Sequence, residues 1–409
     1  MQCRFCNTEL EHVFIDLINS PASNSFLTKE QLNEPETFFP LKVYTCHNCY
    51  LVQVDEYKKS DAIFDSDYVY FSSYSTSWLA HAKQYTELMT EKFGLNEDSQ
   101  VIEIASNDGY LLQYFKEKNI PVMGIEPTAN TAEVATGKGI KTIVEFFGVE
   151  LADRLRNHWE VKADLLLGNN VLAHVPDIVD FVQGMKILLA DTGVITMEFP
   201  HLMQLIDNNQ FDTIYHEHFS YLSFHTVKQI FEAQGLELFD VDEIPTHGGS
   251  LRIYAKHSED ASKTVSENVS KLIEKERKKG IASLDYYSGF QQKALKVKLD
   301  ITSFLIEQKR AGKKVAAYGA AAKGNTLLNY CGIKNDLIEF VVDANPNKQN
   351  KWLPASHIPV VNEDYLKENK PDFVIILPWN LKEEITSQLS YIKDWGGKFV
   401  ITVPELQVI

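Results

Sequence analysis

Apolar runs of strand length alternate with helix-like periodic stretches through the middle of the chain. The runs cover residues 101–105, 121–125, 142–147, 164–167 and 194–198, and the periodic stretches between them include 110–118 and 177–189. Alternation of this kind predicts a parallel sheet that is covered by helices on both faces.

The pattern changes after the fifth run. Residues 236–244 and 249–257 form two more strand-like runs, and the turn residues Pro245, Thr246, His247 and Gly248 join them. Such a turn predicts a β-hairpin. Five parallel strands that end in a hairpin are typical of methyltransferase sheets, whereas NAD-binding sheets usually continue with further strand–helix–strand units.

These patterns divide the chain into three blocks, 1–66, 67–260 and 261–409. The first block is short and rich in turns, so its apolar content could hardly support a core without a metal. The third block opens with a polar helical stretch over 261–312, for which a connecting helix or helical hairpin is predicted. Strands are then expected at 314–318, 338–342, 373–377 and 398–403, in a second, nucleotide-binding-like sheet.

Composition and charge narrow the classes of function. Of the 409 residues, 44% are hydrophobic and 23% are charged, as in ordinary globular domains. The formal net charge of −16 opposes sequence-independent binding to nucleic acid. Neither a membrane-spanning run nor a secretory signal is visible. We therefore expect a cytoplasmic monomer or small homo-oligomer that binds neither nucleic acid nor membranes.

Four cysteines form two pairs with the spacing C-x-x-C: Cys3, Cys6, Cys46 and Cys49. Two such corners can place four thiolates around a tetrahedral zinc ion, and four sulfurs leave no open position, so a structural zinc site is predicted. Disulfides or redox motifs are the alternative, which the lack of a secretory signal disfavours. His12 and His47 lie near the corners in sequence and could replace a ligand.

Residues 101–109, Val-Ile-Glu-Ile-Ala-Ser-Asn-Asp-Gly, read as a strand, a tight turn and a helix start, with one glycine where methyltransferases usually have several. Small residues in this turn let the backbone approach the carboxylate of S-adenosylmethionine, and the N-terminus of the following helix favours that negative charge. Glu126 ends the next strand and could accept hydrogen bonds from both ribose hydroxyls of an adenosyl group. An NAD enzyme would carry the same acid, so Glu126 does not distinguish the two cofactors, and it could also merely cap the following helix. The expected contacts of S-adenosylmethionine are Glu103, Ala105, Ser106, Asn107, Gly109, Glu126 and Asn170.

The densest reactive cluster is Tyr-His-Glu-His-Phe-Ser-Tyr at residues 215–221, after the fifth predicted strand. His174 follows the fourth strand, so both segments should meet at the carboxyl edge of the sheet, where α/β active sites form. Neutral imidazoles and a tyrosine suit general-base chemistry. Two alternatives stay open, a second metal site at His216, Glu217 and His218, or histidines that only satisfy core hydrogen bonds.

Residues 315–326 of the third block have the pattern of a phosphate-binding turn, in which a strand, a small-residue turn and a helix start follow one another. Backbone amides of such a turn can hold a pyrophosphate, and Lys323 would add positive charge. Asp343 ends the next predicted strand and could meet a ribose, while His247 and Gly248 could let the hairpin approach a sugar. Tight Ala/Gly packing and a plain hairpin turn are the alternatives.

These motifs occur in one order along the whole chain, together with Ile-Glu-Pro at 125–127, Glu-His-Phe at 217–219, His-Gly-Gly-Ser at 247–250 and Tyr-Gly-Ala-x-Ala-Lys at 318–323. In this the chain resembles the sugar C-methyltransferases that make branched deoxysugars. The resemblance implies an α/β fold in three parts. These are an N-terminal zinc-binding motif, a class I, Rossmann-like S-adenosylmethionine methyltransferase domain, and a Rossmann-like C-terminal domain that holds a nucleotide sugar.

The resemblance also implies methylation of carbon 3 of an NDP-4-keto-deoxyhexose, with His218 as the general base. The residues that match its active-site companions are Tyr70, His174, Tyr215 and Glu217. The expected substrate contacts are His247, Gly248, Tyr318, Lys323, Asn325 and Asp343. The chain departs from the family pattern twice, because Ala105-Ser106 replaces Gly-Cys in the cofactor turn and His216 stands where aspartate is common.

Two other functions fit the same motifs less well. An NAD-dependent sugar-nucleotide oxidoreductase would use the third block as a dinucleotide-binding fold. It would bind NAD, whereas a methyltransferase should bind S-adenosylhomocysteine. A zinc-ribbon adaptor with an inactive methyltransferase fold would explain the missing glycines of the cofactor turn, but it would have no need of the dense Tyr/His/Glu cluster.

Overall fold

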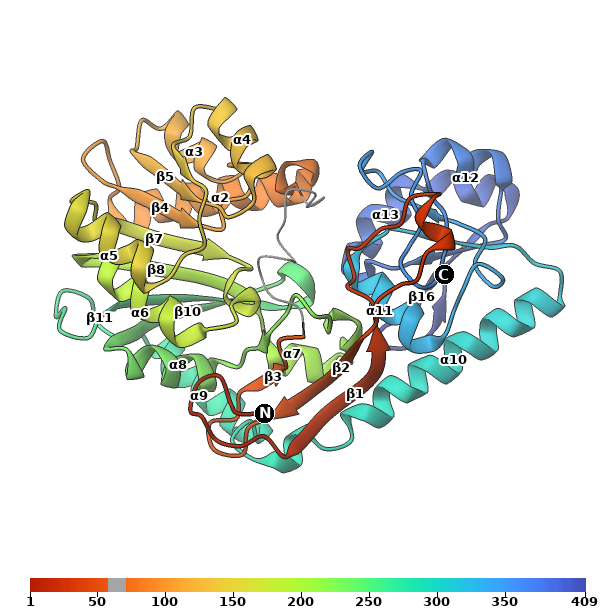
Figure 1. The fold of residues 1–409 in the computed structure, drawn as a ribbon, viewed down its shortest axis with the longest axis horizontal. Helices are drawn as coiled ribbons and strands as arrows, with labels where there is room; N and C mark the ends of the chain where they lie inside the picture. Colours follow the sequence, from red (N-terminus) through yellow and green to blue (C-terminus); the bar gives the residue numbers. More distant parts are fainter. Residues whose placement is uncertain (58–70) are drawn as a thin grey trace.

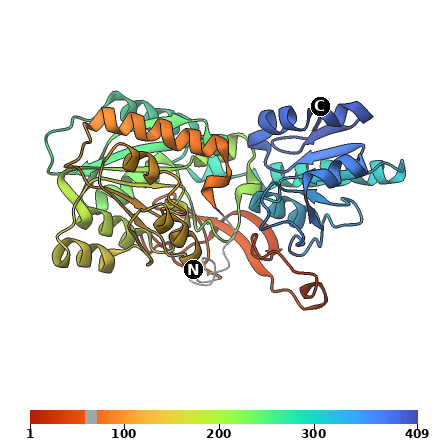
Figure 2. The same cartoon turned by 90° about the horizontal axis from the view of Figure 1, so that it is seen from above.

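The computed structural model describes residues 1–57 and 71–409, whose strands form three sheets of four, seven and six strands. Figure 1 shows the seven-stranded and six-stranded sheets in separate bodies, with the N-terminal strands lying between them. The view from above in Figure 2 shows the same arrangement. No helix in the described ranges combines the length and the apolar character that crossing a membrane requires.

The seven-stranded sheet has the order β10-β11-β8-β7-β4-β5-β6, in which β11 runs antiparallel to both β8 and β10 while the other pairings are parallel. Its strands are β4 (Val101–Ile104), β5 (Val122–Ile125), β6 (Thr142–Ile143), β7 (Ala163–Asn169), β8 (Leu189–Pro200), β10 (Leu236–Ile244) and β11 (Ser250–His257). The predicted parallel sheet with a terminal hairpin is confirmed.

One predicted strand is much shorter than its apolar run. β6 ends at Ile143, whereas the run continues to Phe147. Val144 and Phe146 are about half exposed, and Phe146 and Phe147 line a cavity. These side chains pack beside a pocket rather than in a sheet, which hydrophobic pattern alone does not distinguish from a strand.

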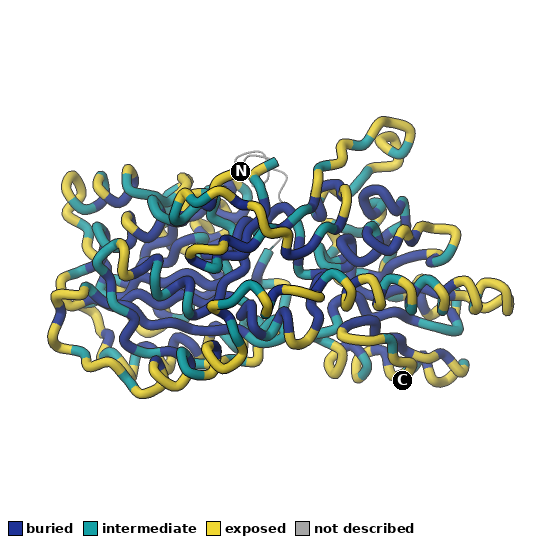
Figure 3. Tube along the Cα trace, turned by 90° about the horizontal axis from the view of Figure 1, so that it is seen from below, coloured by how far each residue is buried: buried dark blue, intermediate teal, exposed yellow. Residues whose placement is uncertain are grey.

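In Figure 3 the strands of this sheet are mostly dark blue, that is buried, and helices cover both of its faces. They are α2 (Thr76–Phe93), α3 (Leu112–Glu117), α4 (Ala129–Gly137), α5 (Val149–Asp153), α6 (Ile178–Leu188), α7 (Leu202–Asp207) and α8 (Phe224–Ala233). In α6, the Asp177 side chain caps the first turn by accepting from the Asp180 amide at 3.0 Å. Phe181, Met185 and Leu188 then face the core at helical spacing.

The four-stranded sheet is antiparallel and joins distant parts of the chain. It consists of β1 (His12–Ser20), β2 (Phe39–Thr45), β3 (Val52–Val54) and β9 (Ser220–Tyr221), in that order. β9 comes from the middle block and pairs with β3. Because Phe14 of β1 stacks on Phe290 at 4.6 Å between ring centroids, the sheet also packs against the C-terminal block.

The polar stretch after the hairpin folds as two helices, α9 (Glu267–Lys279) and α10 (Phe290–Arg310). The C-terminal sheet that follows has the order β14-β13-β12-β15-β16-β17 and is parallel except for β17. Its strands are β12 (Val315–Tyr318), β13 (Val341–Val342), β14 (Val360–Val361), β15 (Phe373–Ile376), β16 (Lys398–Ile401) and β17 (Gln407–Val408), and its helices are α11 (Ala322–Cys331), α12 (Glu363–Asn369) and α13 (Lys382–Gln388). The strand order reverses between β12 and β15, beside the turn into α11, where α/β folds bind ligands.

Candidate active site

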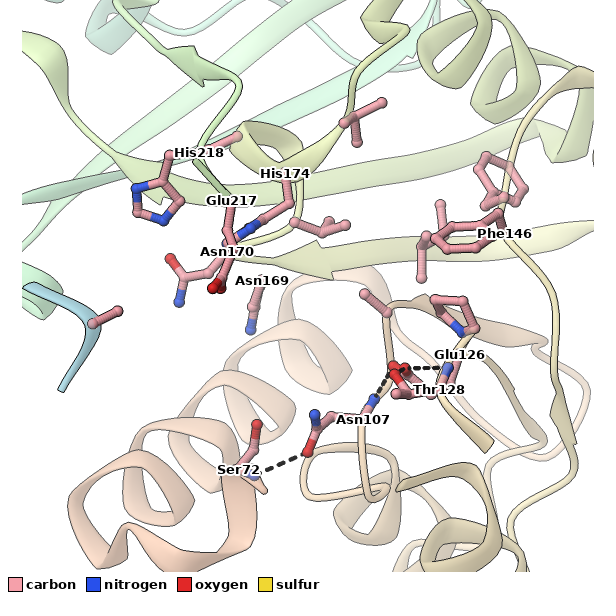
Figure 4. A pocket seen from close by; sticks show the side chains of 18 of the residues that line it. Ser72, Asn107, Glu126, Thr128, Phe146, Asn169, Asn170, His174, Glu217 and His218 are labelled. Atoms are coloured by element: carbon pink, nitrogen blue, oxygen red, sulfur yellow. Dashed lines mark hydrogen bonds between the residues drawn. The ribbon is translucent and has the colours of Figure 1, made fainter. Parts of the chain in front are cut away.

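A cavity of about 470 Å³ lies at the carboxyl ends of β4, β5 and β7 and reaches the turn into α11. Its wall combines all three parts of the chain, from Asn24 near the N-terminus through Glu126 and His218 to Lys323 on α11. Figure 4 shows His218, His174 and Glu217 on one side of this cavity and Glu126 on the other. Such a site can bring two bound molecules together.

Predicted catalytic, cofactor-binding and substrate-binding residues all contribute to the wall of the cavity. Those that line it are Ala105, Asn107, Glu126, Asn170, His174, Tyr215, Glu217, His218, His247 and Lys323. Those that lie outside its wall are Glu103, Ser106, Gly109, Gly248, Tyr318, Asn325 and Asp343. Tyr70 lies outside the described residues.

Predicted cofactor residues that do not line the cavity lie behind its wall, in or beside the turn. Glu103 is fully buried in β4, and burial raises the pKa of its carboxyl group well above the ordinary value. The Ser106 hydroxyl packs where a β-carbon on Gly124 would fall, at 2.4 Å. Gly109 has φ +73°, and a β-carbon there would meet Ile140 at 2.6 Å, so glycine is required at this position.

Predicted substrate residues outside the wall mostly hold the turn before α11 and its surroundings. Asp343 accepts from the Ala320 amide at 2.7 Å. The Tyr318 hydroxyl accepts from the side-chain amide of Gln388 at 3.0 Å. Asn325 donates to the Ser23 carbonyl at 2.6 Å, which ties α11 to the N-terminal segment.

Glu126 joins the two turns at the cofactor end of the cavity. Its carboxylate accepts from the amides of Asn107 and Thr128, each at 2.9 Å, and Asn107 in turn accepts from the Ser72 amide at 2.9 Å (Figure 4). Burial raises the pKa of Glu126. Each carboxylate oxygen has more than one lone pair, so Glu126 can still accept from a hydroxyl in the cavity.

The cofactor turn contains a strained alanine. Ala105 has φ +56°, the left-handed region in which a β-carbon costs roughly 1–2 kcal/mol. Because glycine adopts this conformation freely, we expect Ala105→Gly to stabilise the protein by about 1 kcal/mol, measured by denaturant unfolding. Ala132→Gly, inside α4, is the matched control and should destabilise by about 1 kcal/mol. A loss of stability in Ala105→Gly would contradict the strain.

His218 is held in a single tautomer. Its Nδ1 lies 2.8 Å from the Thr213 carbonyl oxygen, which can only accept, so Nδ1 carries the proton and Nε2 is the basic nitrogen. Burial, with the nearby His174 ring, lowers the pKa of His218 well below its usual 6.5. The imidazole is therefore neutral at pH 7 and able to take a proton at Nε2.

Two aromatic rings pack against this base. The turn closed by the His218 amide and the Tyr215 carbonyl, at 3.0 Å, places the rings of these two residues 4.0 Å apart. The His174 ring lies 4.7 Å from that of His218, and burial lowers the pKa of His174 to about 4. The His174 imidazole is therefore uncharged at neutral pH and adds no positive charge beside His218.

Glu217 is bound from the N-terminal segment. The Asn24 side-chain amide donates to both carboxylate oxygens of Glu217, at 2.8 and 3.0 Å, and both residues line the cavity. The sequence carries no signal for this contact, because Asn24 lies in a turn-rich stretch that has no periodicity.

Asn24→Ala should lower kcat by about 10-fold, because Glu217 loses the donor that orients it, and misplaced groups are costly in catalysis. Asn24→Asp should lower it further at neutral pH, since two carboxylates would face each other. Steady-state methyl transfer measures both. Asn33→Ala, an exposed asparagine of the same segment, should behave as wild type. Wild-type turnover in Asn24→Asp would exclude a role for this contact.

The alternative of a second metal site at His216, Glu217 and His218 finds no support in the part of the chain that the structure describes. His216 turns away, and its Nε2 lies 3.1 Å from the Pro40 carbonyl oxygen. Within the described ranges, four cysteines are the only metal-binding cluster of His, Cys, Asp or Glu side chains: Cys3, Cys6, Cys46 and Cys49.

The cysteine cluster fits zinc. All four sulfurs lie within 4.8 Å of one another, and three of the pairs are 3.5 Å apart. Tetrahedral zinc with bonds of about 2.3 Å needs sulfurs about 3.8 Å apart, close to this spacing. All four thiols are free of disulfides. The site is therefore structural, as predicted.

Some residues of the cavity wall were not predicted. Asn169, next to the predicted Asn170, has an amide oxygen and nitrogen that are both buried without a hydrogen-bond partner in the described structure. Figure 4 shows it between Glu217 and Asn107. A polar ligand would satisfy these atoms, which fits a cavity built for a polar cofactor and substrate. Lys348 adds a second lysine to the wall and donates to the Ala320 carbonyl at 2.8 Å.

Three family models match successive parts of the chain. A zinc binding domain matches residues 3–64, a methyltransferase domain matches 78–241, and a C-methyltransferase C-terminal domain matches 245–404. The C-methyltransferase NovU of Streptomyces niveus is 34% identical over 408 residues, which make up 100% of this chain and 96% of NovU.

Solved structures match part of the chain. An S-adenosylmethionine-dependent methyltransferase from Clostridium acetobutylicum is 12% identical, with a TM-score of 0.36, and covers 44% of this chain and 92% of its own. Another, from Anabaena variabilis, is 15% identical, with a TM-score of 0.36 and coverage of 44% and 86%.

Proposed function

Because the chain belongs to the family of S-adenosylmethionine-dependent C-methyltransferases, we propose that it methylates carbon 3 of a nucleotide-linked 4-keto-deoxyhexose. His218 would be the general base. The observation that carries this proposal is the neutral His218, oriented by Thr213, in a cavity with Glu126 at one end and Lys323 at the other.

The cofactor end of the cavity suits the adenosyl donor. Glu126 would accept from the ribose hydroxyls, and the backbone of Ala105 and Asn107 would approach the amino-acid tail. When bound, S-adenosylmethionine supplies an electrophilic methyl group. Phe146 and Phe147 give this end an apolar wall, against which a purine can pack.

The opposite end suits a pyrophosphate. Lys323 lies in the first turn of α11, its ammonium 2.7 Å from the Asn380 side-chain oxygen and 4.6 Å from the Trp379 ring centroid. Together with Lys348, which lies 3.8 Å from Asp343, and the backbone of Ala321 and Ala322, it gives this end of the cavity a patch of two ammonium groups and backbone amides. Such a patch would hold the nucleotide diphosphate and direct the sugar toward His218.

The chemistry follows from the substrate's ketone. The carbonyl at carbon 4 acidifies the hydrogen on carbon 3, and His218 Nε2 would take that proton while the bonding electrons form an enolate. Tyr215 or His174 would donate to the enolate oxygen. Carbon 3 is then the nucleophile for the methyl group. Holding both molecules in line can contribute up to ~7–11 kcal/mol.

The pH dependence should reflect the neutral base. Because the pKa of His218 lies well below 6.5, the basic form persists as the pH falls, and activity is lost only when the pH passes the lowered value. We expect kcat/KM to stay on its plateau at pH 6.5 and to decline only at lower pH. Measuring kcat/KM between pH 5 and 8 checks this, and an acid limb centred at 6.5 or above would contradict it.

A labelled methyl donor, incubated with TDP-, GDP- and CDP-4-keto sugars, tests the proposal. We expect label on carbon 3 of one of them, located by NMR of the product. Label on oxygen would overturn carbon methylation. Calorimetry with S-adenosylhomocysteine and NAD tests the cofactor separately, and binding of NAD alone would favour an oxidoreductase.

A further inference from the structure

Arg4 lies inside the first zinc corner, between Cys3 and Cys6. Its backbone amide donates to the Gln53 side-chain oxygen at 2.9 Å, and the Gln53 side-chain nitrogen donates to the Cys3 sulfur at 3.2 Å. Gln53 is fully buried in β3. The corner and β3 are therefore fastened together at Arg4.

The guanidinium of Arg4 leaves the zinc corner and reaches toward the cavity. Nη1 donates to the Pro176 carbonyl at 2.8 Å, Nη2 donates to the Val54 carbonyl, and the group lies 5.5 Å from the Phe219 ring centroid. Pro176 follows His174 by two residues and itself lines the cavity, while Phe219 follows His218 directly.

β3 completes the connection to the base. The Val54 amide donates to the Phe219 carbonyl at 3.1 Å, and Gln53 pairs with Ser220 in the sheet. The planar side chain of Arg4 therefore connects two parts of the site. One is the segment that carries His174, and the other is β3, which pairs with the segment that follows His218. A partly buried guanidinium needs such partners, and its fork fixes two of them in one geometry.

We propose that Arg4 is a positioning residue for methyl transfer, which sets the spacing of His174 and His218 from the zinc corner. The zinc site then acts on the reaction without touching a reactant, because the four sulfurs fix the backbone from which Arg4 extends. This inference rests on the role of His218 in the proposed function.

Arg4→Ala and Arg4→Lys test the inference in the full-length, zinc-loaded protein, with Arg277→Ala, an exposed arginine of α9 outside the cavity wall, as the matched control. We expect Arg4→Ala to retain its zinc, to bind S-adenosylhomocysteine within about twofold of wild type, and to lose about 10- to 100-fold in kcat with little change in KM. Arg4→Lys keeps the charge without the fork and should recover only part of kcat.

A second readout does not depend on turnover. In protein labelled with ¹⁵N-histidine, the Nδ1–H signal of His218, identified by its loss in His218→Gln, should shift in Arg4→Ala and stay in place in Arg277→Ala. An unchanged signal together with wild-type kcat overturns the inference, as does a loss of kcat that merely follows a loss of zinc.

Should Arg4→Ala fail to fold, Arg4→Lys decides by the same two measurements. A shifted signal with lowered kcat supports the inference, and wild-type values for both overturn it. Failure of every keto sugar to accept a methyl group would instead overturn the proposed function, and the histidine signal would still decide whether Arg4 positions His218.

Discussion

We expect His218→Gln to lower kcat by about 10²- to 10⁴-fold and to leave the affinity for S-adenosylhomocysteine nearly unchanged. Glutamine keeps a donor that can reach the Thr213 carbonyl but has no basic nitrogen to take the substrate proton. The cofactor end is built from other residues, Glu126 and Asn107 among them, so binding there should survive. Single-turnover methyl transfer and calorimetry measure the two effects separately.

His158→Gln is the matched control, because this histidine is exposed and lies outside the cavity wall. It should keep wild-type turnover. If His218→Gln were as active as His158→Gln, another group would have to be the base, and the proton transfer proposed here would be wrong.

Cys49→Ser should abolish zinc binding and unfold the N-terminal sheet. Structural zinc couples on the order of 10 kcal/mol of binding to folding, since the site does not exist in the unfolded chain. Cys49 is buried, and its carbonyl accepts from the Thr226 hydroxyl on α8 at 3.1 Å, so the damage should spread into the methyltransferase domain. We expect the melting transition to fall by more than about 10 °C and methyl transfer to be lost with it.

Zinc content per chain and scanning calorimetry, with and without a chelator, check this result. Cys331→Ala is the control, because Cys331 is the fifth, buried cysteine and takes no part in the cluster. It should keep its zinc while losing some stability to a small cavity. A chelator that strips the metal without lowering the melting temperature would contradict a structural role.

The sheet could be predicted from sequence because its strands and helices each carry a local period. The hairpin of β10 and β11 was as informative as any motif, since its turn residues and apolar alternation are continuous in sequence. The zinc site could be predicted from the cysteine spacing for the same reason. Each signal lies within a short window of the chain.

The contacts that orient the site could not be predicted, because they join residues far apart in sequence. β9 has two residues and no detectable period, yet it completes the N-terminal sheet. The contacts of Asn24 with Glu217 and of Arg4 with Pro176 involve ordinary surface residue types. Of the predicted site residues that lie behind the wall, Asp343 follows β13 and accepts from the Ala320 amide, and Glu103 is buried inside β4.

The pairing of β3 with β9 also has a consequence for how the chain is made. Residues 52–54 leave the ribosome long before residues 220–221, so the N-terminal sheet lacks its last strand while most of the middle block is still being synthesised. Pairing across such a separation is slow, and an unpaired strand edge invites aggregation in the meantime. Zinc captured early by the two cysteine corners would keep this edge ordered until its partner strand arrives.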